Sequence, residues 1–210
     1  MRAALRREAL EFHGEEYEIP YAGAGATGLG KPLKLLVRPL RDAIPIYLAA
    51  LSPRNVQLAF EIADGWLPIF FSPERARESF GYESRAGFEI APTVHVVLTD
   101  DVEAARDALR PMLALYVGGM GARGANFYNA LVRRYGFEAE AEQIQNLYLE
   151  GKQREAIAAV PDALIDEIAL VGPRERIRDR LDALRESGAT TLLVASADLT
   201  ALRTMAELAL

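Results

Sequence analysis

Two glycine-rich patterns near the amino terminus have the spacing of phosphate-binding loops. Residues 23–28 read Gly-Ala-Gly-Ala-Thr-Gly, which matches the dinucleotide pattern G-x-G-x-x-G, and residues 25–31 match most of the pattern G-x-x-x-x-G-K. Both patterns hold phosphate only between a strand and a helix, because the phosphate rests on the amino terminus of that helix. Here Pro32 replaces the magnesium-binding hydroxyl residue, and Pro39 interrupts any long helix that follows. We therefore predict a surface loop and no nucleotide site.

A second candidate site lies around Ser52. The apolar strand before it ends in Ala49 and Ala50, whose small side chains let a ligand approach the backbone. Ser52 can cap the helix that follows, and Pro53 suits the first position of that helix. The N–H groups of the first turn, with the Ser52 hydroxyl and the Arg54 guanidinium, can hold an anionic phosphate. A plain helix cap with Arg54 in solvent explains the same pattern, and the residues alone favour this plain cap.

Residue types that are scarce or absent exclude several other kinds of chemistry. The sequence has no cysteine, which excludes disulfides, thiolate metal sites and cysteine nucleophiles. The two histidines, His13 and His95, are far apart in the sequence, so no metal site is expected. His95 stands in an apolar strand, where a hydrogen-bonded core histidine is favoured over a catalytic acid.

Charge and composition limit the possible partners. The net charge of −6 is opposite in sign to the basic surface that nucleic acid requires. Half of the 210 residues are apolar, as in a globular domain with a sizeable core, yet no apolar run has the length of a signal peptide or a membrane span. We expect a cytoplasmic protein that binds a small molecule and neither nucleic acid nor membrane.

Strand and helix patterns alternate through most of the chain, as expected for βαβ units around a parallel sheet. The predicted strands are residues 44–50, 66–71, 91–98 and 191–195. Serine–proline pairs at Ser52 and Ser72 open helices after the first two strands, and Gly65 is expected to end the first helix in a left-handed conformation. Residues 118–168 contain no convincing strand and are predicted to be an insertion of several short helices.

Four parallel strands with helices between them form half of a closed (β/α)8 barrel, which needs about 250 residues. We therefore predict an α/β fold of the TIM-barrel class. Residues 1–210 would form a single partial barrel domain with only the last four βα units, plus the insertion at about 118–168. The outermost strands of a half barrel expose unpaired backbone groups and apolar side chains. A homodimer, or a complex with an amino-terminal half-barrel, is expected to cover them.

Several segments, in this order, resemble luciferase-like monooxygenases. The first two are residues 44–55, Ile-Pro-Ile-Tyr-Leu-Ala-Ala-Leu-Ser-Pro-Arg-Asn, and residues 61–66, Glu-Ile-Ala-Asp-Gly-Trp. Residues 116–123, Tyr-Val-Gly-Gly-Met-Gly-Ala-Arg, residues 126–128, Asn-Phe-Tyr, and residues 170–173, Leu-Val-Gly-Pro, are similar to a branch that uses coenzyme F420, a deazaflavin. The resemblance covers nearly the whole chain. It is specific in combination, whereas each segment alone is weak.

The resemblance implies a cofactor site and a substrate pocket. It favours the phosphate-binding interpretation of the Ser52 turn over the plain cap. The predicted cofactor-binding residues are Ala49, Ala50, Leu51, Ser52, Pro53, Arg54, Gly118 and Gly119, and the predicted substrate pocket comprises Asn126, Phe127 and Tyr128. The glycine-rich segment 118–124 is either part of a mobile insertion beside the cofactor or a plain connection between helices. No catalytic residue is assigned, because the family's acid–base residues lie mostly on earlier strands.

The activity that the resemblance implies is hydride transfer between a bound cofactor and an organic substrate. The expected cofactor is coenzyme F420, with FMN as the alternative. F420 transfers hydrides without activating oxygen as flavin does, so the cofactor decides between a reductase and a monooxygenase. Two other hypotheses stay open: a non-catalytic flavin-binding or interaction protein, and an inactive truncated fragment.

Overall fold

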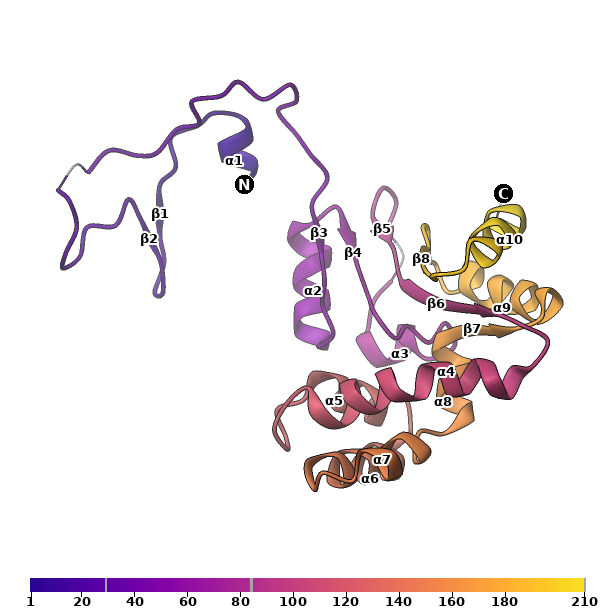
Figure 1. Cartoon of the computed structure of the whole chain (residues 1–210). Coiled ribbons are helices and arrows are strands. Elements are labelled where there is room, and N and C mark those ends of the chain that lie inside the picture. The colour runs from indigo at the N-terminus through magenta and orange to yellow at the C-terminus, as the bar shows by residue number, and fades with distance from the viewer. Residues whose placement is uncertain (29, 84, 210) are drawn as a thin grey trace. The chain divides into compact units, whose positions relative to one another are not determined.

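The computed structural model in Figure 1 describes every residue of the chain except 29, 84 and 210. The chain divides into two compact units, Met1–Pro45 and Ile46–Leu210, and each is described by itself. No helix in the described part of the chain combines the length and the apolar character needed to cross a membrane.

The first unit has little regular structure. It contains the short helix α1 (Arg2–Leu5) and an antiparallel hairpin of β1 (Phe12–His13) and β2 (Glu18–Ile19). The described residues between β2 and Pro45 form turns, bends and loops with one isolated bridge from Leu33 to Leu10, and they contain no helix to receive a phosphate. The prediction of a loop at residues 23–28 is confirmed.

The second unit is built on a parallel sheet (Figure 1). Its strands are β3 (Tyr47–Leu48), β4 (Gly65–Trp66), β5 (Glu89–Ile90), β6 (Thr93–Leu98), β7 (Ala169–Gly172) and β8 (Leu193–Ala195). One group has the order β3-β4-β5 and the other the order β7-β6-β8, and all pairs are parallel. A bridge between Ile69 and Thr93 continues the register of Gly65 with Glu89, so the two groups join into one sheet.

The four strands that the sequence predicts are present, each shorter than its predicted range, but β5 and β7 are additions. All four residues of β7 are buried, and α8 ends directly before it. A parallel strand that is covered on both faces shows no apolar alternation, so its sequence merges with the apolar face of the preceding helix. For this reason the prediction of strands from periodicity missed β7.

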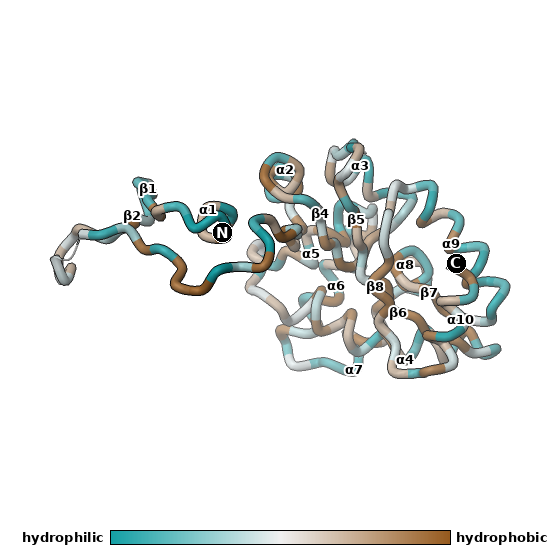
Figure 2. The backbone as a smooth tube through the Cα atoms, turned by 90° about the horizontal axis from the view of Figure 1, so that it is seen from above, coloured by the Kyte–Doolittle hydropathy of each residue, from teal (hydrophilic) through white to brown (hydrophobic). Residues whose placement is uncertain are grey.

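Helices pack beside the strands, and a further helical segment separates β6 from β7. The first set is α2 (Pro53–Ile62), α3 (Ala76–Phe80), α4 (Val102–Ala114), α9 (Arg174–Glu186) and α10 (Leu199–Ala209). The segment after α4 contains the π-helical turn η1 (Leu115–Gly119), α5 (Phe127–Arg134), α6 (Glu138–Leu149), α7 (Gln153–Ala158) and α8 (Asp162–Ile168). Figure 2 shows apolar segments gathered around β6 and β8 in the middle of this unit, with hydrophilic segments towards its periphery.

Gly65 does not end α2 as predicted. The helix ends at Ile62, followed by Ala63 in an extended conformation, and Gly65 is the first residue of β4. A side chain at Gly65 would bring its Cβ within 2.3 Å of the Tyr47 ring. Glycine is therefore required here by a close cross-strand contact and not by the end of a helix.

The two faces of the sheet are buried to different degrees. On one face, here called the covered face, side chains pack against the helices; its members are Leu48, Trp66, Ile90, Val94 and Val96. The opposite face, here called the open face, carries half-buried or exposed side chains on β3, β5, β6 and β8; these are Tyr47, Glu89, Thr93, His95, Val97 and Leu193. On β7, Ala169 and Val171 pair with His95 and Val97 on this face and are buried. Trp66 is 0% exposed, whereas Leu193 is 42% exposed. The sheet is thus covered on one side only, except at β7, where both faces are buried.

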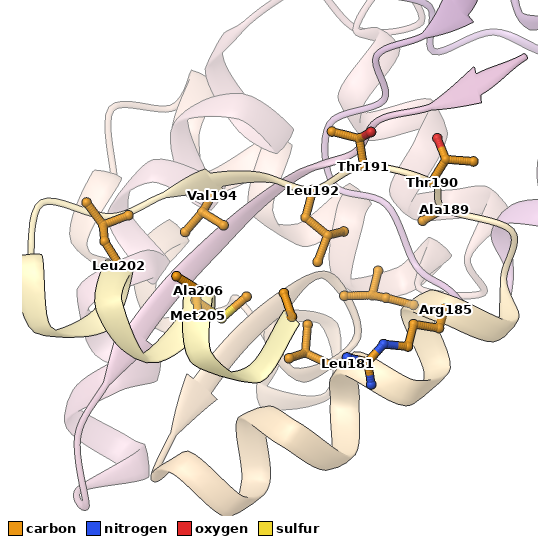
Figure 3. A pocket seen from close by; sticks show the side chains of 12 residues that line it. Leu181, Arg185, Ala189, Thr190, Thr191, Leu192, Val194, Leu202, Met205 and Ala206 are labelled. Carbon is orange, nitrogen blue, oxygen red and sulfur yellow. The ribbon is translucent and has the colours of Figure 1, made fainter.

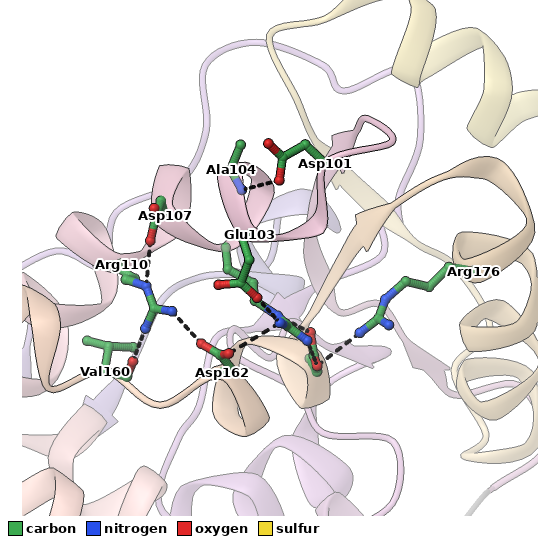
Figure 4. A network of polar contacts seen from close by, with 10 residues as sticks. Asp101, Glu103, Ala104, Asp107, Arg110, Val160, Asp162 and Arg176 are labelled. Carbon is green, nitrogen blue, oxygen red and sulfur yellow. Dashed lines mark hydrogen bonds and ion pairs between the residues drawn. The ribbon is translucent and has the colours of Figure 1, made fainter.

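Ion pairs fasten α8 to α4 and to α9 (Figure 4). Arg106 of α4 lies 2.6 Å from Asp166 and 3.2 Å from Asp162, and Arg110 also contacts Asp162. Arg176 of α9 lies 2.9 Å from Asp166. Burial alone would raise the pKa of Asp166, but hydrogen bonds from Arg106 and Arg176 hold it below its ordinary value. The charged network fixes the end of the helical segment next to β7.

Candidate ligand site

A pocket lies at the carboxyl end of β3, between the β3–α2 turn and the start of α5. Its volume is about 190 Å³, and it is lined by Ala49, Ala50, Leu51, Ser52, Asn55, Phe127 and Tyr128. The first four of these are predicted cofactor-binding residues, and the last two are predicted substrate-pocket residues. Two segments that are far apart in the sequence therefore meet in one pocket. The carboxyl ends of strands are where active sites of (β/α) barrels lie.

Ser52 is the amino-terminal cap of α2, and Pro53 occupies the first helical position. The Ser52 hydroxyl accepts a hydrogen bond of 3.3 Å from the N–H of Asn55. The proposed capping role of Ser52 is confirmed, and the amino terminus of α2 points its partial positive charge at this end of the pocket. Arg54, also in the first turn, is exposed and does not line the pocket.

The turn before Ser52 is held by two long side chains from elsewhere in the chain. The Trp66 Nε1–H donates to the Ala50 carbonyl at 2.9 Å, and the Arg134 Nη2–H donates to the Leu51 carbonyl at 2.6 Å. Arg134 also lies over the Phe80 ring, 5.5 Å from its centroid. Burial lowers the pKa of Arg134, but the ordinary value of an arginine is so high that the side chain stays charged. The buried Trp66 indole and the partly buried Arg134 guanidinium thus fix both carbonyls of the turn.

An aromatic cluster stands behind the pocket. Phe70, Tyr116 and Tyr128 pack edge to face, with ring centroids 4.7–5.9 Å apart. Phe70 has a φ of 52°, a left-handed conformation that is rare and costly for a bulky residue. Burial raises the pKa of Tyr128, so its phenol is neutral near pH 7 and can donate a hydrogen bond to a ligand.

The unusual backbone at Phe70 is held by Tyr135. The Tyr135 hydroxyl donates to the Phe70 carbonyl at 3.0 Å and accepts a hydrogen bond from the Ser72 N–H at 3.3 Å. Tyr135 is 0% exposed, and burial raises its pKa. The hydroxyl therefore closes a turn at the end of β4, next to the turn that Arg134 holds at the end of β3.

Besides Pro53 and Arg54, three predicted site residues lie outside the pocket lining. The Asn126 side chain caps α5 by accepting from the N–H groups of Tyr128 and Asn129, and it donates to carbonyls of η1. A Cβ on Gly118 or Gly119 would collide with Tyr148, at 2.6 and 2.4 Å. Packing explains all three residues, and their contact with a ligand stays a prediction.

His95 differs from the hydrogen-bonded core histidine that the sequence favoured. Its side chain lies on the open face of β6 and is half-buried. Within the described residues it makes no hydrogen bond. Burial lowers its pKa, so the imidazole is mostly neutral at pH 7.

The sequence analysis missed the residues that shape the pocket without forming a recognisable motif. Asn55 lines the pocket, and its position in the first turn after the Ser52 cap is the one local feature of the sequence that could have indicated this. Trp66, Arg134 and Tyr135 act through contacts with residues that are distant in the sequence. No spacing rule predicts such contacts.

A larger pocket, of about 410 Å³, lies between α9, α10 and the chain that enters β8 (Figure 3). Its lining is almost entirely apolar, with Leu181, Leu192 and Met205 among its members and Arg185 as its charged side chain. Arg185 already contacts Asp182 and the Leu208 carbonyl. None of the predicted site residues belongs to this pocket, so it is not the candidate site.

Comparison with protein families gives one match that covers most of the chain. Residues 1–191 match the family model described as luciferase-like monooxygenase. A Mycobacterium tuberculosis protein to which coenzyme F420-dependent oxidoreductase activity is ascribed is 41% identical over 214 residues. This match covers 97% of the chain and 62% of the relative. A 5,10-methylenetetrahydromethanopterin reductase of Archaeoglobus fulgidus is 26% identical, covering 93% of the chain and 57% of that enzyme.

Solved structures agree on the fold. The coenzyme F420-dependent tetrahydromethanopterin reductase of Methanopyrus kandleri superposes with a TM-score of 0.67 at 21% identity, covering 97% of this chain and 58% of that one. An F420-dependent secondary alcohol dehydrogenase, solved with an F420–acetone adduct, gives a TM-score of 0.55 at 17% identity, covering 95% and 55%. The chain thus spans about three fifths of the length of the relatives that it matches.

Proposed function

This chain belongs to the luciferase-like monooxygenase family, and we propose that it takes part in hydride transfer between coenzyme F420 and an organic substrate. The observation that carries the proposal is the pocket in which the β3–α2 turn meets Phe127 and Tyr128. One side is the turn whose sequence resembles luciferase-like monooxygenases, and the other is the segment that resembles the F420-using branch. The relatives named for F420 dependence support the choice of this cofactor over FMN.

The residues of the pocket fit the anionic tail of such a cofactor. The Ser52 hydroxyl, the Asn55 amide and the first-turn N–H groups of α2 are donors at one end, and Arg54 stands beside them with its charge in solvent. Ala49 and Ala50 leave room for close approach to the backbone. Gly118 and Gly119 remain part of the proposed cofactor site on the resemblance alone. When bound, F420 supplies the hydride chemistry, and these residues would hold and orient it.

The size of the pocket limits what it holds. Sites for whole drug-sized ligands measure about 300–1,000 Å³, and this pocket measures about 190 Å³. It is therefore proposed to take part of the cofactor, while Phe127 and Tyr128 face the substrate and Asn126 supports them. Tyr128, as a neutral phenol, would donate to an acceptor oxygen of the substrate.

We propose further that the sheet is part of a (β/α) barrel whose remaining strands are supplied by a second copy or by an amino-terminal half-barrel. The open face and its half-exposed apolar residues support this proposal. Size-exclusion chromatography with light scattering tests it, with an assembly larger than one chain as the expected result. A stable monodisperse monomer would contradict it.

Titration with F420 tests the proposed cofactor, with the change in F420 fluorescence as the signal and FMN absorbance as the parallel measurement. We expect F420 to bind and the double substitution Ser52→Ala with Asn55→Ala to weaken binding by about tenfold or more. Asn146→Ala is the matched control, because its side chain contacts Arg123 away from the pocket.

The titration also separates the competing functions. Tighter binding of FMN than of F420 would identify FMN as the cofactor. Binding without hydride transfer, in the presence of an amino-terminal half-barrel, would favour the non-catalytic flavoprotein. Absence of binding to both cofactors under the same conditions would reject the proposal and favour the inactive fragment.

A further inference from the structure

We infer that Arg134 and Tyr135, consecutive residues at the end of α5, are positioning residues that set the ligand pocket from outside it. Each holds the backbone at the end of a different strand, β3 or β4. The inference about the two turns rests on the geometry of the free protein. Its consequence for F420 rests on the proposed function.

Arg134 holds the turn that leads into the phosphate-binding end of the pocket. Its hydrogen bond to the Leu51 carbonyl fixes the peptide immediately before Ser52, the cap of α2. The Phe80 ring supports the guanidinium from one side. Its Nε–H is buried and has no hydrogen-bond partner among the described residues. A buried donor without a partner costs free energy. The side chain nevertheless keeps this position, so we attribute the position to its hydrogen bond with the Leu51 carbonyl.

Tyr135 holds the neighbouring turn by a different contact. Its hydroxyl donates a hydrogen bond to the Phe70 carbonyl and accepts one from the Ser72 N–H, two residues further along the chain. Because Phe70 has a left-handed backbone that costs free energy by itself, surrounding contacts must hold it in place. The Phe70 ring in turn packs against Tyr128, which lines the pocket.

The same helix that holds both turns also forms a wall of the pocket. The first two residues of α5, Phe127 and Tyr128, line the pocket, and the Asn126 side chain fastens this end of α5 to η1. The far end of α5 holds the opposite wall through Leu51. A shift of α5 would therefore move both walls together, so the helix couples the substrate side of the pocket to the cofactor side.

Amide hydrogen exchange of the free protein, followed by NMR, tests the two contacts. In Tyr135→Phe the Ser72 N–H loses its acceptor, and we expect its exchange to be about tenfold faster. In Arg134→Met we expect a similar increase at Asn55 and Val56, whose N–H groups bond to Ser52. Arg134→Lys keeps one donor for the Leu51 carbonyl and should restore part of the protection.

An arginine and a tyrosine elsewhere in the helical segment provide matched controls. Arg133→Met removes an arginine that contacts Asn129 and Glu142, inside the helical segment. Tyr148→Phe removes a hydroxyl from a ring that packs on Gly118 and Gly119. Both controls should leave exchange in the two turns unchanged. Equal exchange in the Arg134→Met and Arg133→Met proteins would overturn the inference, as would a uniform increase throughout the second unit.

Binding of F420 supplies the second measurement. Arg134→Met and Tyr135→Phe should weaken F420 binding by about threefold to tenfold, while Arg133→Met and Tyr148→Phe should not change it. Unchanged affinity in the first two variants, despite faster exchange of the turns, would reject their role in the ligand pocket. Absence of F420 binding by the unsubstituted chain would contradict the proposed function, and the exchange experiment alone would then decide the positioning role.

Discussion

The covered face and the open face belong to the same strands, yet only one of them has a completed core. Trp66 on the covered face is surrounded by aromatic rings, with Phe71, Phe80 and Tyr82 within 6.0 Å between centroids. On the open face, Tyr47 lies across Gly65 and hydrogen-bonds Glu89, which raises the pKa of the phenol. The difference shows that this fold draws its stability from the helix side.

Trp66→Ala, on the covered face, is expected to cause the largest loss of stability. Removal of a fully buried indole leaves a cavity, and the expected loss is about 3–5 kcal/mol of unfolding free energy. Urea unfolding followed by circular dichroism measures it. Trp66→Phe keeps most of the ring volume but loses the hydrogen bond to the Ala50 carbonyl, so it should cost less. A loss below 1 kcal/mol in Trp66→Ala would show that the covered face does not carry the stability.

The next largest effect is expected at the ion pairs beside the covered face. Arg106→Met leaves Asp162 and Asp166 with fewer partners and should cost about 1–3 kcal/mol. Arg178→Met, at an exposed pair with Asp179, is the control and should have little effect.

Acid titration gives an independent measure of the same network. The folded pKa of Asp166 lies below its ordinary value. Its contribution is therefore present above about pH 4 and is lost as the pH falls through the folded pKa. Unfolding free energies measured between pH 7 and pH 2 should show this loss, and Arg106→Met should reduce it. An acid response that is identical in both proteins would contradict the role of Arg106.

A smaller effect is expected from His95 on the open face. Because burial lowers its pKa in the folded chain, the unfolded chain binds the proton more readily, and stability should fall as the pH drops below about 6.5. His95→Gln should remove this part of the pH dependence. Covering the open face would bury His95 further and steepen the response. A pH profile that His95→Gln leaves unchanged would contradict the prediction.

The smallest effect on stability is expected at Leu193. Leu193→Glu should change the unfolding free energy by no more than about 0.5 kcal/mol, because this side chain is already 42% exposed. It should nevertheless reduce assembly in light scattering, since it places a charge where a partner is proposed to pack. Leu199→Glu, on a side chain that is 67% exposed on α10, should leave assembly unchanged. If both variants assemble equally well, the open face is not the interface.

Local sequence signals predicted the parts of the fold that depend on neighbours in the chain. Ser52 and Pro53 fixed the start of α2, and the alternation of Val94 and Val96 with half-buried residues marked β6. The signals failed where a long-range contact decides the conformation. Position 65 requires glycine because the Tyr47 ring on the neighbouring strand leaves no room for a Cβ. β7 is buried on both faces, so its sequence shows no alternation of apolar and polar residues.

The candidate site was predictable to a similar extent. The resemblance of the Ser52 turn and of Phe127 and Tyr128 to known sequences identified two segments that the structure joins in one pocket. The residues that hold this pocket, Arg134 and Tyr135, carry no motif, because a side chain that reaches a backbone carbonyl needs no particular partner residue. Only the fold shows which carbonyl it reaches.

The pairing of β6 with β7 has a consequence for how the chain folds. Because the entropy lost on closing a loop grows with its length, joining these strands directly across roughly seventy intervening residues is unfavourable until those residues become compact. Helices form from local contacts and fold faster than strands that are distant in sequence. During synthesis, β3 to β6 emerge first and α5 to α8 follow. Compaction of the helical segment is therefore expected to precede the addition of β7 to β6.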